Sequence, residues 1–343
     1  MLKQNTLYLT TPGSYVSRDH LSLKVEIEQQ TKVLLPIHHL ESICVFGPTI
    51  YITPQALRLC WEHGVSVNYF SEHGYFIGRW EGVATGSVGL RRAQYRAADD
   101  AKRATGIARQ CVAGKLQNLR QSLLRSAREN ESAEESGQLS AVAEQIKGIL
   151  RRLEHADSLD VIRGFEGQAA NLYFSVFSLH LRQRREDFAF KTRTRRPALD
   201  RINCLLSFLY ALLRHDVIAA LTATGLDPFV GFLHAERPAR PSLALDMMEE
   251  FRPLLADRLA ITLINRRQIG PKDFIEREGG AVELTKDGRK VVINAYQTRK
   301  QETLQHPLLE QECQVGHLML VQARILARHL RGDISTYLPC VLR

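Results

Sequence analysis

The sequence has few of the features that mark disulfide-stabilised, exported or membrane proteins. Its six cysteines include no CxxC pair, so neither a zinc knuckle nor a disulfide framework is expected. Residues 1–20 contain no apolar run of signal-peptide length. The longest apolar run, residues 204–213, is ten residues long, which is too short to span a bilayer and predicts a buried helix. We therefore expect a cytoplasmic protein with no membrane segment.

The motifs of several common enzyme classes are also missing. The chain contains no P-loop, no GxGxxG, no HExxH and no GxSxG. It also has no internal repeat with a period of about 20–50 residues. Its 343 residues are 44% hydrophobic and 24% charged, which fits one large or two ordinary folded domains.

Positive charge is concentrated in two segments of the chain. The formal net charge is +9, from 46 Lys and Arg against 37 Asp and Glu. Residues 91–130 contain ten basic against three acidic residues, and residues 181–201 contain eight against three. Arginine predominates in both, and its guanidinium group matches the oxygens of a phosphate. The segments indicate a surface that contacts nucleic-acid phosphates, although solvated helix faces would give the same pattern.

The hydrophobic pattern predicts an α+β protein, with a small β-rich N-terminal domain followed by a large, mostly α-helical one. The first eighty residues show period-2 alternation at 21–28 and short apolar runs separated by turn residues. One helix is expected at 54–63, between Thr53 as N-cap and Gly64. A glycine-rich stretch at 81–89 separates this part from the rest. We predict domains at 1–85 and 86–343.

A helical period of 3.6 dominates after Leu90. We expect an exposed acidic loop at 129–138 and a small hairpin at 282–293, with its turn at residues 286–288. The helices are expected at 91–128, 139–155, 159–184, 199–224, 243–267 and 308–331.

One carboxylate lies at the edge of an apolar helix stripe. Glu166 falls among Gly164, Gly167 and other small residues in the helix expected at 159–184. A carboxylate in that position needs a partner, because an unpaired buried charge costs several kcal/mol. The partner can be a metal ion, an arginine or water.

A second cluster of polar residues begins at His234. Pro238 and Pro241 keep the following loop extended, and Ser242 is expected to be the N-cap of the next helix. Asp246 and Glu249 stand three residues apart on that helix, about 5–6 Å from each other. Ordinary placement of acids near a helix N-terminus would explain two carboxylates there.

Glu166, His234 and Glu249 together offer two carboxylates and an imidazole, a ligand set that suits Mg²⁺ or Mn²⁺. Zinc is less favoured, because no thiolate pair contributes. Such an ion would clamp a phosphodiester and activate a hydroxyl nucleophile. Near this cluster, Arg237, Arg240 and Arg252 are candidate phosphate contacts, although Arg252 could instead pair with Glu249 or Glu250.

Three motifs follow one another along the chain: GFEGQAANLYF at 164–174, FLH at 232–234 and SLALDMMEEFRP at 242–253. In this order they resemble the CRISPR-associated adaptation endonuclease/integrase family (Cas-one), most closely its type I-C form. The resemblance extends over nearly the whole chain. It includes residues 5–8, 90–96, 322–324 and 337–339.

This resemblance implies a function, a set of site residues and partners. Glu166, His234 and Glu249 would be catalytic metal ligands for Mg²⁺ or Mn²⁺, with Asp246 supporting them from behind. The β-rich domain would mediate homodimerisation, and the helical domain would bind the metal and the DNA. The protein would join foreign double-stranded DNA fragments into the CRISPR repeat array by attack of a 3′-hydroxyl on a phosphodiester. A second adaptation protein (Cas-two) would complete a larger complex.

Two other functions are compatible with the same residues. A non-catalytic architectural nucleic-acid-binding protein would use the acidic trio as a salt-bridge cluster with Arg237 or Arg252. An RNA-processing nuclease would share the basic segments but would need to recognise ribose.

Overall fold

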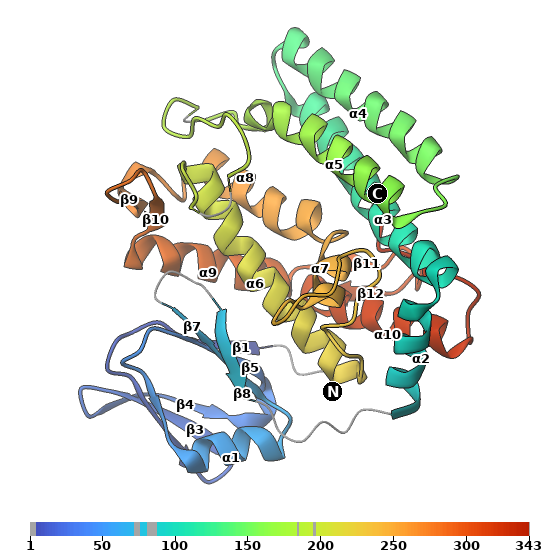
Figure 1. The fold of residues 1–343 in the computed structure, drawn as a ribbon. Helices are drawn as coiled ribbons and strands as arrows, with labels where there is room; N and C mark the ends of the chain where they lie inside the picture. The colour runs from blue at the N-terminus through green and yellow to red at the C-terminus, as the bar shows by residue number, and fades with distance from the viewer. Residues whose placement is uncertain (1–4, 72–75, 81–87, 184, 195–196, 343) are drawn as a thin grey trace. The chain divides into compact units, whose positions relative to one another are not determined.

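A computed structural model describes residues 5–71, 76–80, 88–183, 185–194 and 197–342. The chain divides into two compact units, Met1–Thr85 and Gly86–Arg343. The first is β-rich and the second mainly helical, so the predicted α+β class is confirmed (Figure 1).

The described part of the N-terminal unit contains two four-stranded sheets. In one, β1 (Asn5–Leu9), β5 (Leu40–Phe46) and β7 (Ser66–Phe70) run parallel, and β8 (Phe76–Trp80) adds an antiparallel edge. The other sheet has the order β4-β3-β2-β6 and consists of β2 (Tyr15–Asp19), β3 (Ser22–Ile27), β4 (Gln30–Pro36) and β6 (Tyr51–Ile52).

One apolar core joins both sheets of this unit to its helix. The core includes Val16 and Leu23 from one sheet and Ile43 and Val67 from the other. Helix α1 (Pro54–Glu62) contributes Leu59 to it. The Thr53 side chain caps the helix by accepting a hydrogen bond from the Ala56 amide at 3.3 Å, as the sequence predicts.

The C-terminal unit is built from helices that pack around two long members. Helix α3 (Ala101–Glu129) contacts α4 (Ala133–Leu153) and α5 (Leu159–Ser175), and the three lie side by side (Figure 1). Helix α6 (Arg201–Thr224) contacts α10 (Leu318–Arg331) and α7 (Ser242–Met248). Other helical elements of this unit include α2 (Val88–Asp99), the π-helical segment η3 (Arg252–Asp257), α8 (Arg258–Asn265) and α9 (Lys286–Gln301).

Helix α6 contains the longest apolar run of the sequence. By length and composition it could cross a membrane, but 72% of its most apolar window is buried inside the protein. It is the only such helix in the part of the chain that the structure describes. This burial is that of a core helix, as the sequence predicts for residues 204–213.

Two segments that the sequence predicts to be a loop and a hairpin are partly helical. The prediction of an acidic loop at 129–138 is wrong in its second half, because α4 begins at Ala133. The Ser132 side chain caps this helix by accepting a hydrogen bond from the Glu135 amide. The prediction of a hairpin at 282–293 is also wrong. Strand β10 (Val282–Leu284) pairs with the preceding β9 (Phe274–Glu276), and α9 follows because the Thr285 side chain caps the Gly288 amide at 3.0 Å.

Several predicted helices are shorter or divided. The helix expected at 91–128 breaks at Asp100, whose carboxylate accepts from the Lys102 and Arg103 amides and starts α3. The helix expected at 159–184 ends at Ser175, and the one expected at 308–331 begins only at Leu318. Residues before Leu318 form the hairpin of β11 (Thr303–Gln305) and β12 (Glu312–Gln314).

The helix expected at 243–267 is divided into α7, η3 and α8. Pro253 has no amide hydrogen to donate, which accounts for the loss of regular α-helical bonding at the start of η3. Ser242 is the first helical residue of α7 rather than its N-cap, and its hydroxyl donates to the Ala235 carbonyl at 3.2 Å.

Candidate metal and DNA site

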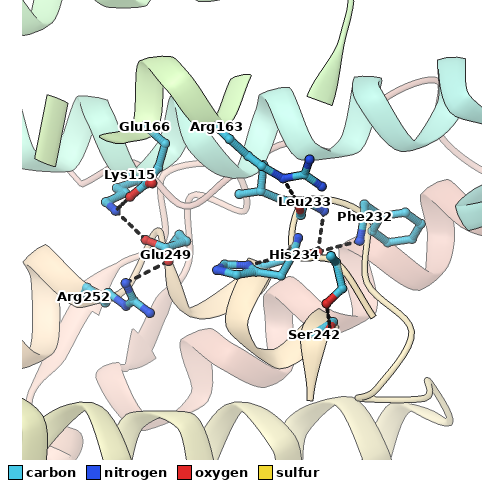
Figure 2. Close-up of polar contacts among 11 residues, drawn as sticks. Lys115, Arg163, Glu166, Phe232, Leu233, His234, Ser242, Glu249 and Arg252 are labelled. Atoms are coloured by element: carbon cyan, nitrogen blue, oxygen red, sulfur yellow. Dashed lines mark hydrogen bonds and ion pairs between the residues drawn. The ribbon is translucent and has the colours of Figure 1, made fainter. Parts of the chain in front are cut away.

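The candidate residues come from three elements of the C-terminal unit. Glu166 lies on α5, His234 on the loop between α6 and α7, and Glu249 at the end of α7. Figure 2 shows the three side chains gathered around one region beneath α3 and α5, with Lys115 of α3 between the two carboxylates. The structure thus brings together residues that are 68 and 15 positions apart in the chain.

Asp246 fixes the position and orientation of His234. One carboxylate oxygen, Oδ1, accepts the amide hydrogen of His234 at 2.9 Å and contacts the ring nitrogen Nδ1 at 2.7 Å. The other, Oδ2, accepts from the amides of Phe232 at 2.6 Å and Leu233 at 2.9 Å. The Asp246 side chain is fully buried, and these bonds leave Nε2 as the imidazole nitrogen available to a ligand.

Two further contacts hold the His234 loop in place. The Arg163 guanidinium of α5 donates to the Leu233 carbonyl at 2.8 Å (Figure 2). A Cβ atom on Gly231 would lie 2.7 Å from Asp246 Oδ2 and 2.7 Å from the Ser242 carbonyl carbon. Glycine is therefore required where the loop passes the buried carboxylate.

Glu249 is buried between two cations. Its Oε1 lies 2.8 Å from the Arg252 guanidinium, and its Oε2 lies 2.7 Å from Lys115 Nζ (Figure 2). Burial raises the pKa of Glu249, but the positive charges of Arg252 and Lys115 outweigh it and bring the pKa to about 2. Glu249 is therefore a carboxylate across the physiological pH range.

Lys115 links the two acidic side chains of the site. Its ammonium forms ion pairs with Glu249 and with Glu166, and its own side chain is only 7% exposed. Glu166 is more accessible, at 27%. One ammonium bridging two carboxylates places positive charge where those oxygens converge.

Arg252 is held by an aromatic ring as well as by Glu249. Its guanidinium carbon lies 5.0 Å from the centre of the Tyr210 ring of α6, a cation–π contact. The Tyr210 hydroxyl in turn donates to Asp257 at 2.7 Å. This chain of contacts positions Arg252 and leaves it largely buried.

Glu250, the next residue after Glu249, faces a different environment. Its carboxyl group contacts the Tyr337 hydroxyl and the Cys340 amide, the latter at 2.5 Å, and Gln322 lies 3.4 Å away. Burial without a cationic partner raises the pKa of Glu250 to about 8. This carboxyl group joins the C-terminal segment to the end of α7.

The residues present suit a divalent cation in their donor chemistry. No group of three His, Cys, Asp or Glu side chains in the described ranges is gathered closely enough to hold a metal as it stands. The Lys115 ammonium instead bridges Glu166 and Glu249. The two carboxylates thus already converge on one positive group beside an oriented imidazole. Anionic oxygens that converge in this way are the environment that a hard divalent ion prefers.

The sequence and the fold both match known proteins. The family model described as CRISPR associated protein Cas1 matches residues 7–298. The chain belongs to the Cas1 family. It is 47% identical over 339 residues to CRISPR-associated endonuclease Cas1 1 of Moorella thermoacetica, with 99% of this chain and 98% of that protein covered.

Solved structures give the same assignment for the fold. A CAS1 protein from Thermotoga maritima superposes with a TM-score of 0.83 at 26% identity, covering 99% of this chain and 100% of that one. A chain of a partial Cas6-RT-Cas1–Cas2 complex superposes with a TM-score of 0.68 at 25% identity, covering 99% and 100%. The resemblance noted from the sequence motifs is confirmed at the level of the Cas1 family, and its type I-C form stays a prediction.

The candidate phosphate contacts of this Cas1 protein lie in different settings. Arg252 pairs with Glu249, which is one of the two arrangements that the sequence allows. Arg237 is exposed and Arg240 half-buried, and neither guanidinium forms an ion pair within the described ranges. Arg237 and Arg240 are therefore the candidates that have free donors.

Lys115 and Arg163 belong to the site although the sequence motifs do not select them. In the sequence, Lys115 stands out only as a member of the basic segment 91–130. The position of Lys115 in the helix nevertheless indicates that its side chain is buried, because Cys111 and Leu119, four residues away on either side, are buried on the same face of α3. A lysine within an apolar stripe needs a buried anionic partner.

Proposed function

We propose that this Cas1-family protein is a divalent-metal-dependent DNA endonuclease and integrase of CRISPR spacer acquisition. The observation that carries the proposal is that Glu166, His234 and Glu249, from three separate elements, lie around one region, with Asp246 buried behind the imidazole (Figure 2). Glu166, Glu249 and His234 Nε2 would hold one Mg²⁺ or Mn²⁺. The bound ion would supply Lewis-acid stabilisation of a phosphodiester under attack.

The chain's own residues have distinct roles in this proposal. Asp246 keeps His234 Nδ1 engaged, so that Nε2 faces the site, and its four contacts leave it no oxygen for direct ligation. This arrangement favours Glu249 over Asp246 as the direct ligand. Arg237 and Arg240 would contact DNA phosphates, while Arg252 would hold Glu249 ionised.

The proposed reaction joins a DNA fragment to the repeat array through its 3′-hydroxyl. The partners would be double-stranded DNA, a second copy of the chain and Cas2, all in the cytoplasm. The Cas2 assignment draws on the structural likeness to a chain of the partial Cas6-RT-Cas1–Cas2 complex. The relative from Moorella, named an endonuclease, supports nuclease activity.

We further propose that residues 1–85 mediate homodimerisation. Strands β4 and β8 are edges of their sheets, and they expose Leu34 and Ile77 at 54% and 69%. Exposed apolar edge strands are ready surfaces for pairing with another chain. Light scattering should find a dimer at micromolar concentration, and Leu34→Lys with Ile77→Lys should shift it to monomer. A dimer that survives both changes would place the interface elsewhere.

A strand-transfer assay tests the proposed reaction. Labelled DNA fragments with free 3′-hydroxyls are incubated with a supercoiled target, with and without Mn²⁺ or Mg²⁺, and with and without Cas2. Joined products should require the divalent ion and a 3′-hydroxyl. A fragment blocked at its 3′ end is the control and should give no joined product.

The architectural alternative is favoured by one specific observation. Lys115 and Arg252 already neutralise Glu166 and Glu249, as a structural salt-bridge cluster would. The two functions differ in metal dependence. DNA binding that survives chelation, with no strand cleavage or joining under any divalent ion, would support the architectural function.

A further inference from the structure

A cavity of about 1330 Å³ lies in the C-terminal unit outside the Glu166, His234 and Glu249 cluster. Its walls are the second half of α3, the four residues His180, Arg182, Gln183 and Arg185, and the helices α8 and α9. Both basic segments of the sequence reach it, through Arg125 and Arg128 from the first and through Arg182 and Arg185 from the second. Segments far apart in the chain thus meet around one space.

Positive charge predominates in the lining of this cavity. Among the described residues, seven arginines and four glutamates line it. Several arginines have acidic partners, for example Arg125 with Glu129 at 3.0 Å and Arg299 with Glu302. Because these partners leave three positive charges in excess, the cavity favours an anion.

Arg128, Arg258 and Arg266 are the lining arginines without an acidic partner among the described residues, and of these Arg258, at the start of α8, is the one that is not exposed. It is half-buried, and its guanidinium forms no ion pair or hydrogen bond with any described side chain. Burial and the neighbouring charges of Arg125 and Arg299 outweigh the opposing charges of Glu129 and Glu302 and lower the pKa of Arg258 to about 10, so it is still charged at neutral pH. A half-buried guanidinium whose donors have no acceptor is costly.

We propose that this cavity binds the sugar–phosphate backbone of DNA, with Arg258 as its central phosphate contact. Guanidinium groups match phosphate oxygens with two parallel donors, and Gln121 and Asn294 add neutral polar groups to the wall. No Phe, Tyr or Trp side chain is among the described residues that line it, so bases have no stacking surface. Recognition here is independent of base sequence.

The cavity and the proposed metal site share structural elements. Asn118, one turn after Lys115 on α3, lines the cavity, and so does Pro253, which directly follows Arg252. DNA held in the cavity would therefore run beside the cluster of Glu166, His234 and Glu249. The inference rests on the proposed function and names a second contact for the same DNA substrate.

The test compares Arg258→Gln with Arg331→Gln, which removes the same charge at the end of α10, away from the cavity. Affinity for a labelled DNA duplex of random sequence is measured over a series of salt concentrations. Arg258→Gln should weaken binding about tenfold, the effect of one lost charge-assisted hydrogen bond. It should also lower the slope of log affinity against log salt by about 0.9.

Arg331→Gln should change neither affinity nor slope, and Arg258→Lys should recover part of the slope because it keeps the charge. Equal affinity and slope for Arg258→Gln and Arg331→Gln would overturn the proposal. So would unchanged DNA binding with weakened binding of Cas2, which would make an acidic protein segment the occupant. Metal-dependent cleavage by the wild type is measured in parallel, and its absence would contradict the proposed function rather than this site.

Discussion

Glu249 and Glu250 are neighbours in the chain and lie in opposite electrostatic environments. Glu249 faces Lys115 and Arg252, and its pKa falls to about 2 despite burial. Glu250 faces the neutral donors of Tyr337, Cys340 and Gln322, and burial raises its pKa to about 8. One end of α7 therefore holds one carboxylate that stays ionised and one carboxyl group that stays protonated at neutral pH.

The difference in pKa suits the two carboxyl groups to different roles, a chemical one for Glu249 and a structural one for Glu250. An ionised carboxylate beside an oriented imidazole is a ligand for a cation, whereas a protonated carboxyl group among neutral donors is a hydrogen-bonding anchor. Glu250 and Asn118 tie the C-terminal segment to α7 and α3, since Asn118 donates to the carbonyls of Glu250 at 2.9 Å and Cys340 at 2.8 Å. The contacts that Glu250 and Asn118 make with the C-terminal segment therefore help to fix the end of α7, where Glu249 lies.

Replacing Glu249 should have the largest effect. Glu249→Gln removes an anionic ligand and leaves Lys115 and Arg252 without their shared carboxylate. We expect metal-dependent cleavage to fall on the order of 100-fold or more, a loss of at least about 2.7 kcal/mol of transition-state stabilisation. Single-turnover cleavage of labelled DNA at saturating Mn²⁺ measures it. Activity within a factor of about three of wild type would remove Glu249 from the ligand set.

Replacing Asp246 should have the next largest effect. Asp246→Asn keeps the size but loses the charge that supports His234 Nδ1 and three backbone amides. Loss of such a partner behind a ligand weakens metal binding by about 10–100-fold. A Mn²⁺ titration of cleavage should therefore shift to higher concentration while the maximal rate falls less than in Glu249→Gln. Equal damage from the two replacements would reverse their assigned roles.

Replacing Lys115 should show whether its ammonium and the metal use the same carboxylates. Without divalent ions, Lys115→Met leaves Glu166 and Glu249 short of a partner, and removal of a buried partner costs about 3–5 kcal/mol. Mn²⁺ should restore much of this stability and should raise the melting temperature more in Lys115→Met than in wild type. Calorimetry with and without Mn²⁺ measures both. A rise no larger than that of wild type would show that Lys115 and the ion do not compete.

Replacing Glu250 should have the smallest effect on chemistry, and its effect on stability should depend on pH. The folded pKa of about 8 lies above the ordinary value of 4.5, so the folded chain holds a proton that the unfolded chain releases between these pH values. The contribution of Glu250 to stability is complete below about pH 4.5 and is lost as the pH rises toward 8.

The measurement for Glu250 is urea unfolding of wild type and Glu250→Gln from about pH 5 to about pH 8, the interval over which the stability changes. The stability advantage of the wild type should shrink as pH rises, while cleavage by the variant stays within a few-fold of wild type. A difference that stays constant with pH would show that Glu250 is ionised in the folded protein. The comparison with Glu249 would then fail.

The sequence is enough to predict the class of fold and the location of most elements. The change in hydrophobic period near Leu90 separates strands from helices, because burial of one face imposes a period of 2 or 3.6. The N-terminus of α9 is not predicted, because Asp287-Gly288 has the composition of a hairpin turn, although Thr285 is a good N-cap. Local turn signals compete with capping signals, and tertiary packing decides between them.

The candidate site can be predicted only in part. The motifs select Glu166, His234 and Glu249 as candidates, and their role as ligands stays a prediction. The role of Lys115 depends on how α3 packs against α5 and α7, which no local pattern contains. The opposite states of Glu249 and Glu250 likewise depend on Arg252 and on a C-terminal segment nearly ninety residues further along the chain.

The central claim is that Glu166, His234 and Glu249 hold one divalent ion that acts on DNA. Calorimetric titration of Mn²⁺ into wild type, His234→Ala and Glu250→Gln tests it most directly, because it measures binding apart from activity. We predict one ion per chain for wild type and Glu250→Gln, and loss of that binding in His234→Ala. Binding of Mn²⁺ by His234→Ala with wild-type affinity and stoichiometry would contradict the claim.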